Sequence, residues 1–213
     1  SNLELSNNES DAFILYRSFL ATDKNIKVHF FNIPLANEVK RIYVEKMLHE
    51  GTKLSFERLL NDSAYKAEHR QGLIEIGDGY RQKYSENIWL NKIDDVISMI
   101  AQDFQSDNNF NVFSITDLRY TNEPIYLEQT YEHIMPILTS KVNAKLTTRL
   151  ARMTEEQAYM FLKKHKNNAS ERNIKRLVAD FELDNNGNVE HLSNQIHKDI
   201  MPCINLLINR HNV

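Results

Sequence analysis

With 213 residues, 41% of them hydrophobic and 26% charged, the chain has the size and composition of one globular domain, and we expect a single domain over residues 1–213. A formal net charge of −3 argues against a nucleic-acid binder, which usually carries an excess of basic residues. No stretch reaches the roughly 18 consecutive apolar residues of a membrane span and no apolar leader opens the chain, so we expect a cytoplasmic protein that does not bind a membrane.

The first quarter of the chain predicts a helix, a strand and a second helix. Residues 12–20 (AFILYRSFL) carry apolar residues in the density of a buried helix. Residues 26–34 (IKVHFFNIP) are typical of a strand and end at Pro34. A helix is predicted over residues 35–49, and Gly51 is its expected C-terminal cap.

The next stretch predicts mostly helix, followed by a strand. Residues 55–84 are expected to be largely helical, with Ser55 and Ser63 as helix caps. Residues 86–104 show the clearest helical period in the chain, with one broad apolar face. Residues 111–116 (NVFSIT) then predict a strand.

The second half of the chain continues the alternation of helices and strands. The expected elements are a helix over 123–134 opened by Pro124, a strand within 136–144, helices over 146–166 and 169–178, and a strand, an Asn186-Gly187 turn and a helix over 179–211. Strands separated by helices imply parallel βαβ units. We therefore predict an α/β protein with a doubly wound parallel sheet flanked by helices.

One long segment resembles a known family. Residues 56–82 (FERLLNDSAYKAEHRQGLIEIGDGYRQ) contain a Phe-x-Arg-Leu-Leu run, then Ser-x-Tyr-Lys, an Arg four residues later, and a Gly and an Arg-Gln pair further on. This run resembles the central helical region of the animal-type phosphomevalonate kinases. It is much more specific than a two-residue motif.

Four further segments resemble parts of the same family and follow in the same order. They are NIPLANEVK (32–40), ITDLRYTNE (115–123), VNAKLTTRLARM (142–153) and ADFELDNNGNVEHLSNQI (179–196), the last also similar to the phage-type deoxynucleotide kinases. The resemblance implies a P-loop fold like that of the nucleoside monophosphate kinases. It also implies a helical acceptor-binding region at about 52–106 and a lid region at about 145–178.

The resemblance assigns anion- or substrate-binding roles to six residues, five cations and the aspartate beside them. Phosphoryl transfer depends on positioning and on cations that converge on the phosphates. The residues implied are Lys66, Arg70, Asp117, Arg119, Arg149 and Arg152. Lys66 and Arg70 are four residues apart on one helix and so face the same way. The competing interpretation of the basic pairs is a solvated helix face, and that of Asp117 is a turn cap.

The sequence departs from the family where ATP would bind. A P-loop needs glycines, whose backbone N–H groups surround the phosphates, and a lysine. Residues 3–13 (LELSNNESDAF) have neither, and the first glycine of the chain is Gly51 and the first lysine Lys24. Glu9 and Asp11 would repel a triphosphate. We therefore expect a degenerate Walker A loop, unless the loop was removed from the N-terminal end.

Two departures on the acceptor side complete the functional prediction. Ala36 replaces a lysine of the family, and Tyr120 replaces an arginine. We expect a phosphomevalonate-kinase-like pseudoenzyme, a pseudokinase without ATP or Mg²⁺, that acts as a non-catalytic binding or structural protein. Its partner would be an unidentified protein, with residues 146–177 as a contact face.

Two alternatives stay open. The first is an active ATP- and Mg²⁺-dependent kinase of phosphomevalonate or a deoxynucleoside monophosphate. The second is a sensor of a phosphate-bearing ligand or partner, which would use Lys66, Arg70 and Arg119.

Other chemistries have weaker signals. The single cysteine, Cys203, has apolar neighbours and is predicted to be a small core residue. Eight histidines occur without metal-ligand spacing, so no metal is expected and His191 and His197 are predicted to lie at the surface.

Overall fold

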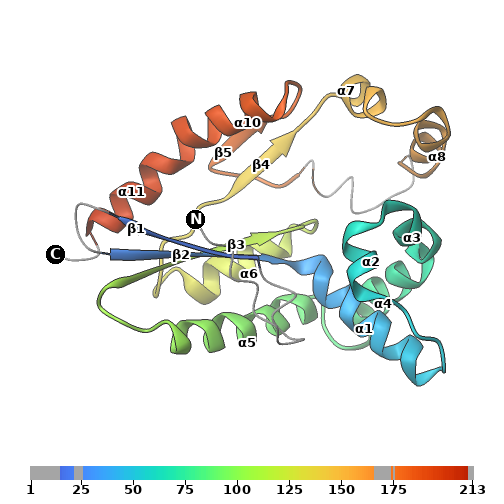
Figure 1. Cartoon of the computed structure of the whole chain (residues 1–213), viewed down its shortest axis with the longest axis horizontal. Coiled ribbons are helices and arrows are strands. Elements are labelled where there is room, and N and C mark those ends of the chain that lie inside the picture. Colours follow the sequence, from blue (N-terminus) through green and yellow to red (C-terminus); the bar gives the residue numbers. More distant parts are fainter. Residues whose placement is uncertain (1–14, 22–25, 166–173, 175, 211–213) are drawn as a thin grey trace. The chain divides into compact units, whose positions relative to one another are not determined.

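Figure 1 shows a computed structural model of the protein, which describes residues 15–21, 26–165, 174 and 176–210. The chain divides into two compact units, unit 1 (residues 1–118) and unit 2 (residues 119–213). Both units contain helices and parallel strands, so the predicted α/β class is confirmed. The single domain stays a prediction.

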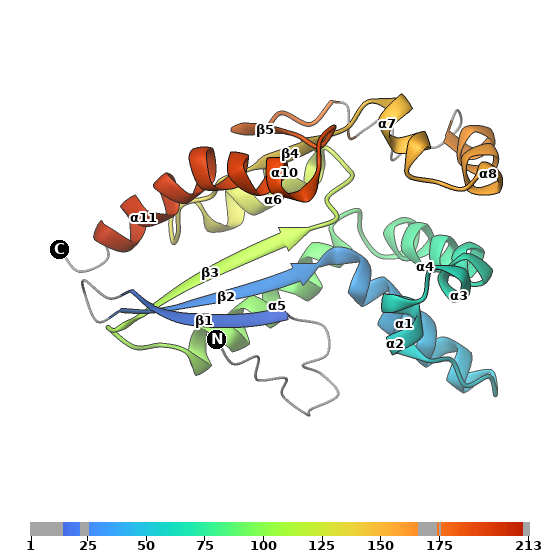
Figure 2. The same cartoon turned by 45° about the horizontal axis from the view of Figure 1, so that its top comes forward.

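Unit 1 contains a three-stranded sheet and five helices. They are β1 Leu15–Ala21, β2 Ile26–Pro34, α1 Leu35–His49, α2 Phe56–Asn61, α3 Ser63–Glu68, α4 Arg70–Lys83, α5 Ile88–Asp103 and β3 Asn109–Thr116. The strand order is β1-β2-β3. β2 and β3 are parallel, from Lys27 opposite Asn109 to Pro34 opposite Thr116, as Figure 2 shows. The predicted strand and helix over 26–49 and the helix within 86–104 are confirmed.

The predicted helix over residues 12–20 is wrong for its described part. Residues 15–21 form β1, which pairs antiparallel with β2. The Tyr16 hydroxyl is hydrogen-bonded to Nδ1 of buried His29 at 2.7 Å, and its ring stacks on Phe31. A short apolar run fits a helix or a strand equally well, and pairing with β2 decides between them. Residues 12–14 and the segment 3–13 lie outside the described residues.

The core of unit 1 is built from β2 and α5. Ile26 and Val28 of β2 are fully buried, as are Trp89 and Ile93 of α5, which lies along one side of the sheet in Figure 1. The Trp89 indole N–H donates to the Gly77 carbonyl of α4 at 3.1 Å. This bond satisfies the one polar atom of a large buried ring.

Helix ends in unit 1 follow local capping chemistry. Gly51 has φ +83° directly after the end of α1, which confirms its predicted role. Ser55 caps α2 by accepting from the Arg58 N–H at 3.2 Å, as predicted. The predicted cap at Ser63 is wrong, because Asp62 caps α3 by accepting from the Tyr65 N–H at 3.0 Å. An Asp side chain one residue earlier competes effectively for the same free N–H groups.

Unit 2 contains two parallel strands and a series of helices. They are α6 Asn122–Tyr131, β4 Ser140–Asn143, α7 Leu146–Ala151, α8 Glu155–His165, β5 Phe181–Asp184, α10 Val189–Gln195, the π-helical segment η2 Ile196–Ile200 and α11 Met201–Arg210. β4 and β5 pair with each other, and α10, η2 and α11 follow one another as a continuous rod in Figure 1. The described strands thus form two sheets, and the one doubly wound sheet stays a prediction.

The predictions for unit 2 are largely confirmed. Pro124 lies in the first turn of α6, and β5 is followed by a turn at Asn186 and Gly187 and then by α10. The predicted helix over 146–166 is interrupted at residues 152–154, between α7 and α8. Most of the predicted helix over 169–178 lies outside the described residues, and residues 177–179 are not helical.

Side-chain exposure in unit 2 tests two further predictions. His191 and His197 are exposed, as predicted, whereas Cys203 is half-buried and is not a core residue. Among the helices that the structure describes, none combines the length and the apolar character needed to cross a bilayer.

Candidate functional site

The junction between β2 and α1 places the start of a helix directly at the end of a strand. Pro34 ends β2 and Leu35 begins α1, and no side chain caps the N-terminus of this 15-residue helix. The first N–H groups of a helix have no partner within it, and they favour an anion. This junction lies beside the carboxyl end of β3, because Pro34 is in register with Thr116. In parallel sheets this is the edge where ligands bind.

Lys40 lies on α1 one turn beyond this junction and is buried. Only 6% of the residue is exposed, and its Nζ donates to Asn37 Oδ1 at 2.8 Å. The pKa of Lys40 is lowered from 10.5 to about 8, mainly by burial and also by nearby Lys66, while Asp117 acts in the opposite direction. The protein therefore holds an ammonium group where water is largely excluded and where a second cation is in electrostatic range.

Asp117 follows β3 directly and has a strained backbone. Its φ is 68°, the one positive φ outside glycine among the described residues. This left-handed conformation costs most residues about 1–2 kcal/mol, although Asp tolerates it better. Strain of this kind clusters at functional sites. The predicted position of Asp117 at the carboxyl end of a strand is confirmed.

Aromatic contacts position the helix that carries Lys66. The Tyr43 hydroxyl of α1 is hydrogen-bonded to Nδ1 of His69 at 3.2 Å. The His69 ring packs edge-on against Tyr65, with 4.5 Å between ring centroids, and the Arg58 guanidinium lies 4.1 Å above the Tyr65 ring. These contacts join α2 and α3 to α1 and so place exposed Lys66 within reach of Lys40.

The three residues predicted in unit 1 are thus not equivalent. Lys66 and Asp117 both act on buried Lys40. Arg70 is the first residue of α4 and is exposed. Two residues later in α4, Gly72 packs so closely on Tyr43 of α1 that an added Cβ would lie 2.5 Å from the ring. This contact holds the start of α4 against α1.

Arg119 belongs to unit 2, where its backbone is fixed by a buried carboxylate. Glu123 is 1% exposed and its Oε2 accepts from the backbone N–H groups of Arg119 at 2.5 Å and Tyr120 at 3.0 Å. These bonds fix the backbone that leads into α6. The Arg119 residue itself is exposed.

The two arginines predicted for the lid have structural partners in unit 2. The Arg149 guanidinium lies 4.6 Å above the Phe161 ring. Arg152 donates to the carbonyl oxygens of Asn185 at 2.9 Å and Gly187 at 2.8 Å, and to Asn185 Oδ1 at 3.3 Å. Arg152 thus ties the end of α7 to the turn between β5 and α10.

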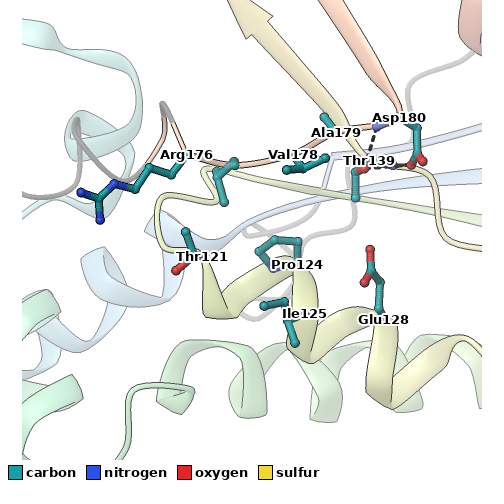
Figure 3. Close-up of a pocket in the computed structure, with 10 residues that line it drawn as sticks. Thr121, Pro124, Ile125, Glu128, Thr139, Arg176, Val178, Ala179 and Asp180 are labelled. Atoms are coloured by element: carbon teal, nitrogen blue, oxygen red, sulfur yellow. Dashed lines mark hydrogen bonds between the residues drawn. The ribbon is translucent and has the colours of Figure 1, made fainter.

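A shallow cavity of about 370 Å³ lies elsewhere in unit 2, between α6 and the segment before β5. Figure 3 shows Pro124, Ile125 and Glu128 of α6 facing Val178 and its neighbours across it. One of its polar groups, Asp180, already accepts from the N–H and hydroxyl of Thr139, and these hydrogen bonds lower the pKa of Asp180. The cavity offers an anion little attraction, because two carboxylates, Glu128 and Asp180, line it against one cation, Arg176.

Sequence reasoning missed Lys40 and Asn37. No helical period signalled them, because Asn37 and Lys40 are buried on the side of α1 roughly opposite Leu35 and Ile42. A lysine there needs a reason. Among the described residues no cluster of three or more His, Cys, Asp or Glu side chains could hold a metal ion.

No family model, curated protein or solved structure matches the chain.

Proposed function

We propose that this protein binds a phosphate-bearing small molecule at the site formed by the start of α1, Lys66 and Asp117, and that it works without transferring a phosphoryl group. In this proposal it is a phosphomevalonate-kinase-like pseudoenzyme with a doubly wound P-loop-kinase-like fold. The phosphorylated ligand, or a protein that carries a phosphate, is its partner.

One observation supports the binding proposal above the others. A buried ammonium, Lys40, lies within range of a second cation, Lys66, at the carboxyl edge of a parallel strand pair. Like charges near each other are unfavourable in the absence of an anion. The start of α1, which no side chain caps, adds backbone N–H groups that also favour an anion.

The proposal of binding without transfer is supported by what the chain offers a nucleotide. Its 213 residues contain no Gly-x-x-x-x-Gly-Lys segment. β2 passes into α1 without an intervening loop, and Asn185–Asn188 between β5 and α10 contain one glycine and no lysine. P-loop kinases hold the phosphate donor with such a loop.

Thermal unfolding with added ligand tests the proposal. Millimolar phosphomevalonate, a deoxynucleoside monophosphate or inorganic phosphate should raise the unfolding midpoint, because a ligand of the folded state stabilises it once its concentration exceeds Kd. Mg·ATP should leave the midpoint unchanged. No shift with any phosphorylated probe would contradict the binding proposal.

The kinase alternative has its own readout. Turnover of phosphomevalonate or a deoxynucleoside monophosphate with Mg·ATP, abolished by replacing Arg149 and Arg152 with Ala, would establish an active enzyme and overturn the pseudoenzyme proposal. A shift of the unfolding midpoint with phosphate, without turnover, supports the pseudoenzyme proposal.

A further inference from the structure

We infer that Lys40 is itself a ligand-binding residue, whose ammonium group binds the phosphate of the ligand together with Lys66. The resemblance to a kinase family gives this lysine no role. The inference rests on the proposed function for the class of ligand, and it adds the residue that determines affinity.

The ammonium group of Lys40 has more hydrogen-bond donors than the described part of the protein satisfies. A lysine ammonium has three N–H donors, and Lys40 uses one of them for Asn37 Oδ1 among the described residues. With 6% of the residue exposed, water has little access to the other two. Leaving donors of a charged group unsatisfied in a buried place is costly. A ligand with several acceptor oxygens removes that cost.

Lys40 and the charged groups around it carry a net positive charge. The charged groups that act on it are Lys66 of α3, which repels it, and Asp117 after β3, which attracts it. Two cations and one carboxylate leave an excess of one positive charge, while Asn37 is neutral. A phosphate dianion or monoanion is attracted by both ammonium groups and relieves their repulsion.

Lys40 differs from Lys46 and Lys141, two other lysines in the described residues, in the partner of its ammonium group. Lys46 lies on the same helix, its side chain is 49% exposed, and it lies 3.8 Å from Glu50. Lys141 is mostly buried but donates to the Leu177 carbonyl at 3.3 Å and lies 3.9 Å from Glu182. Both have a carboxylate within 4 Å, whereas the one hydrogen bond of Lys40 goes to a neutral amide.

The test compares Lys40→Met with a matched control, Lys46→Met, by titration calorimetry with phosphomevalonate and with inorganic phosphate. Loss of a charge-assisted hydrogen bond should raise Kd about 10- to 100-fold for Lys40→Met. Lys46→Met should bind as the wild type does. Thermal unfolding checks that both variants are folded, and Lys40→Arg, which keeps the charge, should retain part of the affinity.

A second variant separates ligand contact from a structural role. Residues 36 and 40 lie on the same face of α1, four residues apart. Adding Ala36→Lys to Lys40→Met returns an ammonium group to that face and should recover affinity, whereas Ala36→Lys with Lys40 in place should bind no more than about twofold more tightly than the wild type. An equal gain in both backgrounds would show that Lys40 has only a structural role. In parallel, carbon NMR of lysine Cε should show phosphate raising the pKa of Lys40.

The outcomes distinguish the two proposals. If the wild type binds phosphate and Lys40→Met binds it equally well, Lys40 is not a ligand-binding residue and the proposed function stands. If the wild type binds neither probe, the proposed function fails and the role of Lys40 fails with it. Weakened binding with recovery by Ala36→Lys supports both.

Discussion

Lys40 in unit 1 and Arg152 in unit 2 are both cations with defined partners, but their surroundings differ in kind. Arg152 is exposed and donates to three oxygen atoms of the turn between β5 and α10. Lys40 is buried, donates to one neutral oxygen and has Lys66 within range. The guanidinium of Arg152 thus has three protein oxygen atoms to donate to, which suits a cation that holds the fold together. The ammonium of Lys40 has one among the described residues, which leaves N–H donors for a ligand. The resemblance to kinases favoured the first and ignored the second.

The largest effect is expected from removing the charge of Lys40. The pKa difference between its ordinary 10.5 and about 8 in the folded protein corresponds to about 3 kcal/mol against the charged folded state at neutral pH. Lys40→Met should therefore raise the free energy of unfolding at pH 7 by about 2–3 kcal/mol without ligand, as measured by urea denaturation. Lys46→Met should change it by less than about 0.5 kcal/mol. A less stable Lys40→Met would show that the ammonium group is satisfied and structural.

The same charge gives the wild type a distinct pH dependence. Between about pH 8 and 10.5 the folded state loses the proton of Lys40 while the unfolded state keeps it, so the unfolded state binds more protons. Stability from this group therefore rises with pH across that window. Because other groups titrate alike in both proteins, the stability gap between Lys40→Met and the wild type should narrow from pH 8 to 10.5. A constant gap would contradict the lowered pKa.

A smaller effect is expected where α4 packs on α1. A Cβ at Gly72 would lie 2.5 Å from the Tyr43 ring, whereas nothing lies within 4 Å of a Cβ at Gly79 of the same helix. Overpacking costs about 1–3 kcal/mol, and the better helix propensity of Ala returns up to about 1 kcal/mol. Gly72→Ala should thus destabilise the protein by about 1–2 kcal/mol in urea denaturation, and Gly79→Ala should stabilise it. Equal effects would show that α1 and α4 do not pack this closely.

Local patterns predicted much of the fold and little of the site. β2 and α1 were predictable to the residue, because an apolar run ends at Pro34 and a helical period ends at Gly51. β1 was not, since a short apolar run has no period of its own and pairing with β2 sets its conformation. The resemblance predicted Lys66 and Asp117, which do act on a common group.

The burial of Lys40 could not be read from sequence. It depends on the approach of α3 and of the end of β3, and these contacts come from distant parts of the chain. The sequence position of a lysine on a helix shows which residues lie on the same face. It does not show which other part of the chain covers that face. The roles of Arg149 and Arg152 have the same origin, because their partners Phe161, Asn185 and Gly187 are set by the path of the chain in unit 2.

The smallest effect is expected from Arg152, and it tests the other half of the comparison. Arg152→Ala removes three exposed hydrogen bonds and should lower the free energy of unfolding by about 1 kcal/mol, because water replaces much of what is lost. Arg152→Lys should not restore it, since one ammonium group cannot reproduce the planar fork that reaches Asn185 and Gly187 together. Affinity for phosphomevalonate should stay within about twofold of the wild type. A tenfold loss of that affinity in Arg152→Ala would instead place Arg152 among the ligand-binding cations, and the contrast with Lys40 would no longer hold.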